Sequence, residues 1–204
     1  MISIDPTQNS ERDNYKLMTG SIIPRPIAFV TSQAKDGTLN GAPYSYFNIV
    51  SSNPPLISVS VQRKKGEPKD TARNIQERKE FVVHIVDQQN VHPINETAAS
   101  LPPDQSEVET AQLTAVKSSK ISVPGIQEAK VRMECVLEQL IELGGDGITA
   151  GTDLIIGKIV QFHIDDQVYY DHCKIDPDAL GAVSRLAGNS YANIGKNFEI
   201  ERPK

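Results

Sequence analysis

Short runs of hydrophobic residues that alternate with polar residues dominate this chain. In the clearest run, residues 56–62, Ile57, Val59 and Val61 alternate with polar side chains, which is the period of a strand with one buried face. Similar runs predict strands at residues 27–31, 81–86, 131–143 and 152–165. Clusters of Gly, Pro and Asp separate them, as is typical of antiparallel sheets. The pattern therefore predicts a mainly β protein.

Helical signals are few and short. The clearest covers residues 70–79, where Asp70 and Thr71 provide a capping signal and Ala72 and Ile75 share one face. A second helix is expected to begin near Asn95, and segment 102–119 is expected to be loop or mixed structure. We find no repeat and no domain boundary. We therefore expect one domain over residues 1–204, a β-barrel with peripheral helices.

Residues 24–48, PRPIAFVTSQAKDGTLNGAPYSYFN, form the most informative segment. A rigid Pro-x-Pro entry precedes a short apolar strand, and a Gly turn leads to a second stretch with aromatic rings and small polar groups. Such a pair of strands can place backbone amides and hydroxyls along one side of a flat ligand with polar edges. A flavin is a ligand of this kind.

The chain becomes basic between Arg63 and Lys79, although the whole protein carries a net charge of -5. Within this stretch Lys69, Asp70 and Thr71 stand where a loop is expected to become a helix. Helix N-termini present unpaired amide donors and a partial positive charge, which suits a phosphate group. The alternative is a solvated loop with an ordinary cap at Asp70. Taken with segment 24–48, the basic stretch favours a phosphate-bearing cofactor.

Composition and charge favour a globular protein that does not bind nucleic acid nonspecifically. The 204 residues are 38% hydrophobic and 23% charged, as in a globular domain, and the acidic balance argues against nonspecific nucleic-acid binding. The start of the sequence lacks a signal peptide pattern and no apolar run is long enough to span a membrane, so we expect a cytoplasmic protein. Cys135 is expected to be a buried, inert thiol, and Cys173 beside His172 falls short of a metal-ligand set.

Other site signals are weaker. Residues 145–150 match the G-x-G-x-x-A dinucleotide fingerprint, but a β-branched run follows where that fingerprint needs a helix. His84 alternates with apolar neighbours and is expected to be a satisfied strand histidine. The histidines and acidic residues support no metal site, and there is no G-x-S-x-G hydrolase motif.

Five motifs taken in order carry a resemblance to a known family. They are PRPIAFVTS, GTLNGAPYSYFN, SSNPPLISVSV, the pattern R-x-x-G-x-x-KDT-x-x-N, and EFVVHIV. Together they resemble the flavin reductase-like family, whose members bind FMN in a split β-barrel of Greek-key antiparallel strands. The resemblance runs from about Gly20 to Gln161, with a weaker tail from Arg185 to Tyr191.

The resemblance implies a set of site residues. Pro26, Ile27, Thr31 and Ser32 would border the flavin from the first strand. Ser45, Tyr46, Phe47 and Asn48 would bind the polar edge of its ring and the ribityl chain. Arg63, Lys69, Asp70, Thr71 and Asn74 would surround the phosphate. Arg185 and Tyr191 would complete the substrate pocket, from the same chain or from the second copy in a homodimer.

The implied activity is that of an NAD(P)H:flavin oxidoreductase that supplies reduced flavin or electrons to a partner such as a monooxygenase. Because the flavin carries the redox chemistry, no catalytic acid or base is expected. Many short flavin reductases carry Gly-Asp-His where this chain has Gly145-Asp146-Gly147. The missing His leaves open a flavoredoxin-like FMN carrier without a nicotinamide site. A third hypothesis is a barrel that binds another phosphorylated ligand through Lys69 and Thr71.

Overall fold

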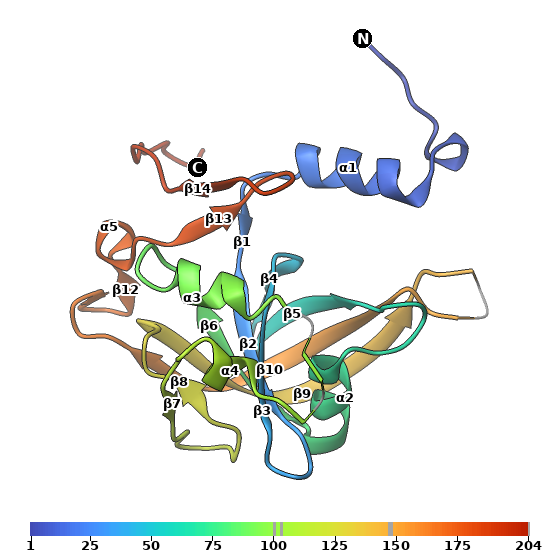
Figure 1. Cartoon of the computed structure of the whole chain (residues 1–204). Helices are drawn as coiled ribbons and strands as arrows, with labels where there is room; N and C mark the ends of the chain where they lie inside the picture. The colour runs from blue at the N-terminus through green and yellow to red at the C-terminus, as the bar shows by residue number, and fades with distance from the viewer. Residues whose placement is uncertain (100, 103, 147–148, 204) are drawn as a thin grey trace.

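A seven-stranded antiparallel sheet forms the body of the protein (Figure 1). The computed structural model describes residues 1–99, 101–102, 104–146 and 149–203. In order across the sheet, the strands are β3 (Leu39–Tyr44), β2 (Ala28–Gln33), β6 (Glu80–Ile85), β9 (Val131–Leu143), β10 (Thr152–Ile164), β5 (Pro55–Gln62) and β4 (Phe47–Ser52). Every strand predicted from the hydrophobic pattern is present, which confirms the mainly β class.

The two edge strands of this sheet are consecutive in the chain. Only Ser45 and Tyr46 separate the end of β3 from the start of β4, although β3 and β4 lie at opposite edges. The sheet must therefore curl until its edges approach each other, and β3 also contacts β5. Among the described residues no pairing joins β3 to β4, so the barrel is split and does not close.

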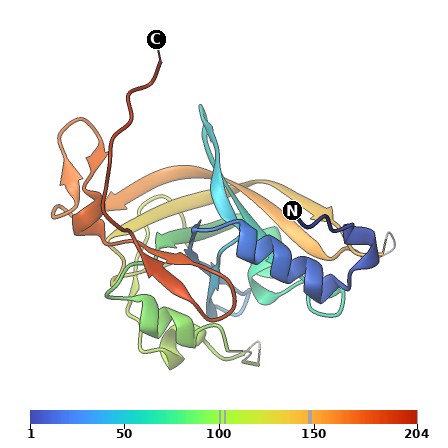
Figure 2. The same cartoon turned by 90° about the horizontal axis from the view of Figure 1, so that it is seen from above.

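Shorter elements surround the sheet. A ribbon of β1 (Arg25–Pro26), β13 (Val183–Arg185) and β14 (Tyr191–Asn193) lies beside helix α1 (Glu11–Ser21) at one end of the body, as both views show (Figures 1 and 2). The other elements are η1 (Pro6–Gln8), α2 (Asp70–Arg78), α3 (Val91–Glu96), α4 (Glu107–Thr110), β7 (Ala115–Val116), β8 (Gly125–Ile126), β11 (Tyr169–Tyr170), β12 (Lys174–Ile175) and α5 (Pro177–Leu180).

The helices differ from the sequence prediction in three ways. Helix α2 is confirmed, but its N-cap is Lys69 and not Asp70. The helix expected to begin near Asn95 was misplaced, because α3 starts at Val91 and has ended by Glu96. Helix α1 was missed: the side chain of Ser10 caps it by accepting a hydrogen bond from the Asp13 amide, but only Thr19 is buried, so its sequence shows no apolar stripe.

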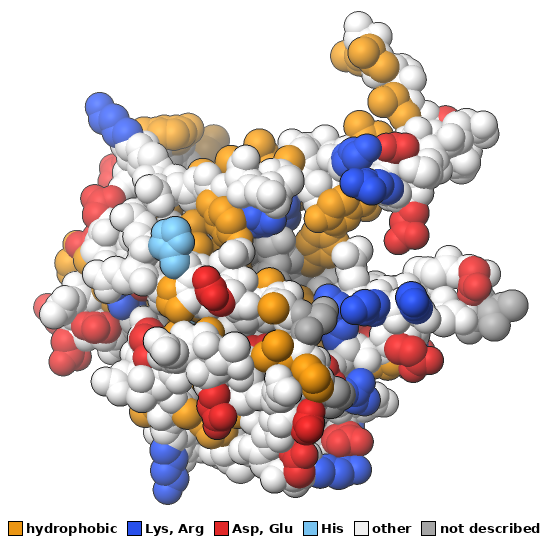
Figure 3. Space-filling view, viewed as in Figure 1, with side chains coloured by type: hydrophobic (Ala, Val, Ile, Leu, Met, Phe, Trp, Pro, Cys, Tyr) orange, Lys and Arg blue, Asp and Glu red, His pale blue; other side chains and the backbone are white. Residues whose placement is uncertain are grey.

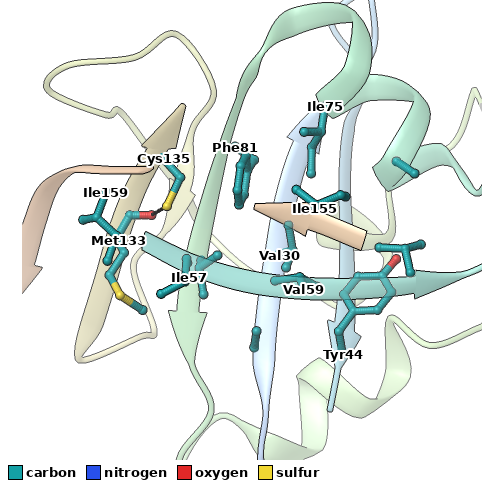
Figure 4. Packing of buried hydrophobic residues seen from close by; sticks show 14 residues of the cluster. Val30, Tyr44, Ile57, Val59, Ile75, Phe81, Met133, Cys135, Ile155 and Ile159 are labelled. Atoms are coloured by element: carbon teal, nitrogen blue, oxygen red, sulfur yellow. Dashed lines mark hydrogen bonds between the residues drawn. The ribbon is translucent and has the colours of Figure 1, made fainter. Parts of the chain in front are cut away.

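The main core lies inside the curled sheet, where α2 covers one opening (Figure 4). Ile75 of α2 meets Val30, Phe81 and Ile155 there, all fully buried. Gly157 of β10 leaves room for the ring of Phe81, since a Cβ atom at this position would lie 2.3 Å from the ring Cζ. Cys135 is buried in the same cluster, and burial raises the pKa of its thiol, which confirms the expectation of an inert cysteine.

A histidine in the core is held in its neutral form. His84 of β6 is fully buried; its Nδ1 lies 2.9 Å from the carbonyl oxygen of Phe29, and its Nε2 accepts a hydrogen bond of 3.0 Å from the Ile126 amide. Both ring nitrogens are thus satisfied, as predicted. Desolvation lowers the pKa of His84 to about 3.

His84 should make the protein less stable in mild acid. The unfolded chain protonates this ring near its ordinary pKa, whereas the folded chain does not until about pH 3, so protons favour the unfolded state in between. We expect the free energy of unfolding to lose about 1.2 kcal/mol from this residue between pH 6 and pH 5. Urea titrations at both values should show a smaller loss in His84→Gln than in wild type or in the exposed control His92→Gln. Equal losses in all three proteins would contradict the assignment.

Candidate functional site

A cavity of about 370 Å³ opens where α2 begins. Its walls come from β3, from the loop before α2, from the first turn of α2, from Thr97–Ala99 with Leu101 after α3, and from Glu107 at the start of α4. Three of the residues predicted to surround a phosphate, Lys69, Asp70 and Thr71, line this cavity. The structure thus brings together the first turn of α2 and one face of β3, which are far apart in the sequence.

The cavity has a cationic end. Lys64, Lys69 and Arg73 line it, and Figure 3 shows Lys and Arg side chains gathered beside the hollow on this face. Lys69 occupies the N-cap of α2 without a side-chain capping bond, so no side chain caps the first-turn amides. Desolvation, and then the nearby charge of Lys64, lower the pKa of Lys69. The carboxylate of Asp70 pairs with Arg73. These features favour an anionic group at the end of α2.

A buried network of polar side chains forms part of the cavity wall. The Tyr44 hydroxyl donates to Thr71 Oγ1 at 2.9 Å, and Thr71 Oγ1 donates to Asn40 Oδ1 at 2.8 Å. Ser32 Oγ also donates to Asn40 Oδ1, at 3.2 Å, and accepts from Asn74 Nδ2 at 3.3 Å. Ser32, Thr71 and Asn74, which were predicted to contact a ligand, are therefore joined in one network through Asn40. Burial raises the pKa of Tyr44 to about 12, so this hydroxyl stays protonated.

Arg63 lies apart from the residues that line the cavity. Its Nη2 donates to Asp153 Oδ1 at 2.6 Å and contacts Glu142 Oε1 at 3.0 Å, and its Nε lies 3.1 Å from both Asp153 oxygens. The side chains of Arg63 and Asp153 are 10% and 2% exposed. Hydrogen bonds to Asp153 are the largest cause of the raised pKa of the guanidinium. This arrangement favours a structural role for Arg63 over a phosphate contact.

The residues predicted on the first strand are divided between surface and core. Pro26 is exposed in β1 and Ile27 is buried. The hydroxyl of Thr31 is used inside the protein, because it donates to the carbonyl of Pro124 at 2.7 Å. None of these three residues lines the cavity at α2.

The predicted ring-binding residues form the link between the sheet edges. Ser45 is half-buried and accepts a 3.5 Å hydrogen bond from Arg25 Nε. The hydroxyl of Tyr46 is buried and has no hydrogen-bond partner among the described residues, and burial raises its pKa. Phe47 packs against the core, whereas Asn48 is exposed and accepts from the Ile49 amide. Tyr46 is thus the member of this group with an unsatisfied polar atom.

Arg185 and Tyr191, which were predicted to complete the substrate pocket, contact each other. Arg185 stacks on the ring of Tyr191 at 4.4 Å and donates through Nη2 to the carbonyl of Gly188, while its buried Nη1 has no partner within the described ranges. The Tyr191 hydroxyl donates to Asn95 Oδ1 at 2.8 Å. Tyr191 also lines a second cavity of about 530 Å³, between the β13–β14 ribbon and α3. The structure therefore groups these two residues, but not with the cavity at α2.

The sequence prediction missed several residues of the cavity wall. Asn40 and Tyr44 line it together with Ala42, and period-2 alternation in the second half of segment 24–48 could have placed all three on one face. Glu107 carried no usable signal, because it belongs to the polar segment 102–119, for which no regular structure was expected.

The residues present fit flavin mononucleotide. The α2 end offers amides and cations for a phosphate, and the buried Tyr46 hydroxyl and Arg185 Nη1 are polar atoms without a partner in the part of the chain that the structure describes. Across the described ranges, no three His, Cys, Asp or Glu side chains are grouped so as to hold a metal ion. Similarly, no helix in the described part of the chain is long and apolar enough to cross a membrane.

The dinucleotide fingerprint at residues 145–150 is not supported. Gly147 and Ile148 lie outside the described residues, and Gly147 is the position at which the resemblance led us to look for a His. The chain that follows forms the strand β10 and not the helix that the fingerprint requires.

Several solved structures share this fold. Nitrilotriacetate monooxygenase component B from Bacillus cereus is 60% identical, with a TM-score of 0.96 over 98% of both chains. The 2-nitrobenzoate 2-nitroreductase NbaA of Pseudomonas fluorescens is 30% identical, with a TM-score of 0.89 over 99% of this chain and 96% of that one. A candidate flavin reductase with a split barrel domain from Shewanella frigidimarina NCIMB 400, 22% identical, shares the fold with a TM-score of 0.84 over 97% and 96% of the two chains.

The family follows from a match over most of the chain. Residues 19–176 match the model of the flavin reductase like domain, a span that includes the split sheet and the cavity at α2. The chain therefore belongs to the flavin reductase-like family.

Proposed function

We propose that this protein binds FMN and reduces it with NAD(P)H, and so supplies reduced flavin or electrons to a partner such as a monooxygenase. The observation that carries the proposal is the uncapped start of α2, which lines a cavity with Lys69 in a chain of the flavin reductase-like family. The 60% identity to a protein named as a monooxygenase component B supports the partner class.

In this proposal the chain binds and orients the cofactor, and bound FMN supplies the hydride-accepting ring. The amides at the start of α2 and the ammonium of Lys69 hold the phosphate. The Tyr46 hydroxyl, to which no described residue is bonded, donates to the polar edge of the ring. No catalytic residue is assigned, because a protein that binds a flavin needs only to orient the ring and to tune its electrostatic environment.

A homodimer is part of the proposal. Large hydrophobic side chains are exposed on α1 and on the strand β4 beside the Ser45–Tyr46 link, among them Tyr15, Met18, Ile49 and Val50. A second copy that covered them would also cover the surface near Tyr46. Light scattering after size exclusion should give twice the mass of one chain, and a monomer at micromolar concentration would exclude this assembly.

The test is a binding titration followed by reduction. FMN added to the purified protein should be retained through desalting or titrate with a measurable Kd, and rapid mixing with NADH or NADPH should bleach the flavin band faster than for free FMN. Absence of FMN binding would refute the proposal. Binding without bleaching by either nucleotide would instead favour the flavoredoxin-like carrier, to which the missing His of the Gly145-Asp146-Gly147 segment points.

A further inference from the structure

One wall of the cavity at α2 holds a buried carboxylate that is only half satisfied. Glu107, the first residue of α4, is 8% exposed and lines the cavity. Its Oε2 accepts from Asn40 Nδ2 at 2.9 Å and from the Gly41 amide at 3.4 Å. Its Oε1 accepts no hydrogen bond from any described residue.

An ionised carboxylate can only accept hydrogen bonds, so Oε1 of Glu107 is open to a donor group on a ligand in the cavity. The cationic residues on the cavity wall, Lys64, Lys69 and Arg73, belong to the start of α2 or to the loop before it. The cavity thus combines an anion-binding end with an acceptor oxygen. A ligand that suits both must carry a hydrogen-bond donor next to its anionic group.

The two features are near neighbours. One side chain, that of Asn40, bonds to Thr71 in the first turn of α2 through Oδ1 and to Glu107 through Nδ2, at 2.8 and 2.9 Å. Because Asn40 is 8% exposed and fixed at both ends, it holds the carboxylate at a constant place relative to the amides of α2. In FMN, the ribityl hydroxyls are the donors that follow the phosphate at this short spacing.

We propose that Glu107 is a binding residue of this site and that its Oε1 accepts a hydrogen bond from a ribityl hydroxyl of FMN. The proposal rests on the proposed FMN function and adds the group that recognises the sugar-alcohol chain. Asn40 and Gly41 are positioning groups, since they hold the carboxylate through its other oxygen.

The test removes each partner of the proposed hydrogen bond in turn. Dissociation constants are measured for FMN and for its analogues that lack one ribityl hydroxyl, with wild type, Glu107→Ala and Glu107→Gln. For one analogue, wild type should lose affinity about tenfold relative to FMN, because a hydrogen bond to a charged acceptor is lost. With Glu107→Ala the same analogue and FMN should bind within twofold of each other. Glu107→Gln, which keeps an oxygen for Asn40 and Gly41, should show an intermediate ratio.

The control is Glu109→Ala, an exposed glutamate of the same helix that does not line the cavity, and it should keep the wild-type ratio. A structural role for Glu107 would weaken FMN and every analogue by the same factor and leave the ratios unchanged, which would overturn the proposal. In that case wild-type FMN binding would still stand. If wild type failed to bind FMN, the proposed function itself would fall.

Discussion

Replacing Arg63 by alanine should lower the free energy of unfolding by about 3–5 kcal/mol, the cost of leaving one partner of a buried ion pair alone. Asp153 would lose its cationic partner at a site where its side chain is 2% exposed. The loop that begins at Arg63 would also lose its tie to the β9–β10 hairpin, since Arg63 contacts Glu142 as well. Urea unfolding monitored by circular dichroism measures this change.

The matched control is Lys16→Ala, which removes an exposed ion pair with Asp13 and should change stability by less than about 0.5 kcal/mol. The folded Arg63→Ala protein should also keep the wild-type ratio of FMN to riboflavin affinity, because Arg63 does not line the cavity. A variant of normal stability whose FMN affinity alone fell would restore Arg63 to the phosphate site.

Replacing Lys69 by alanine should weaken FMN binding roughly 10- to 100-fold and leave riboflavin binding nearly unchanged. A charge-assisted hydrogen bond contributes about 1.5–3 kcal/mol, and riboflavin lacks the phosphate that would receive it. The backbone amides at the start of α2 remain, so binding should be weakened but not abolished. Fluorescence quenching of each flavin on titration gives both dissociation constants.

Lys65→Ala is the control for Lys69. Lys65 lies in the same basic loop, is exposed, and does not line the cavity, so the ratio of the two affinities should stay at the wild-type value. A parallel fall of FMN and riboflavin affinity in Lys69→Ala would place the phosphate elsewhere. Unchanged affinity of Lys69→Ala for FMN and for riboflavin would also place the phosphate elsewhere.

The strands could be predicted from the sequence because burial of one face makes apolar and polar residues alternate along each strand. Val59 and Val61 alternate with polar residues on one strand, and each strand repeats the pattern within a few residues. The start of α2 could be predicted almost as well as the strands, since its charged and capping residues are adjacent in the chain. Helix α1 was not, because it buries only Thr19 and therefore shows no periodicity.

The site residues were harder to predict because their partners are distant. The sequence shows Arg63 beside Lys69, but the partner of Arg63 is Asp153, 90 residues away. Thr71 looks like a free hydroxyl until Tyr44 and Asn40 are brought beside it. Glu107 approaches Asn40 across 67 residues from a segment without periodicity. Local pattern was thus enough to predict a cationic helix start at Lys69, whereas the tertiary structure was needed to separate side chains that are open to a ligand from side chains bonded within the protein.

The short link between β3 and β4 has a consequence for how the protein acquires its cofactor. Ser45 and Tyr46 join strands at opposite edges of the sheet, so their final position depends on every pairing from β2 to β5. These pairings bring together residues far apart in the chain, which makes them slow to form. Tyr46 should therefore reach its place only in the last step of folding. Flavin recapture during refolding should lag behind the recovery of β-sheet signal, and added FMN should accelerate no earlier phase.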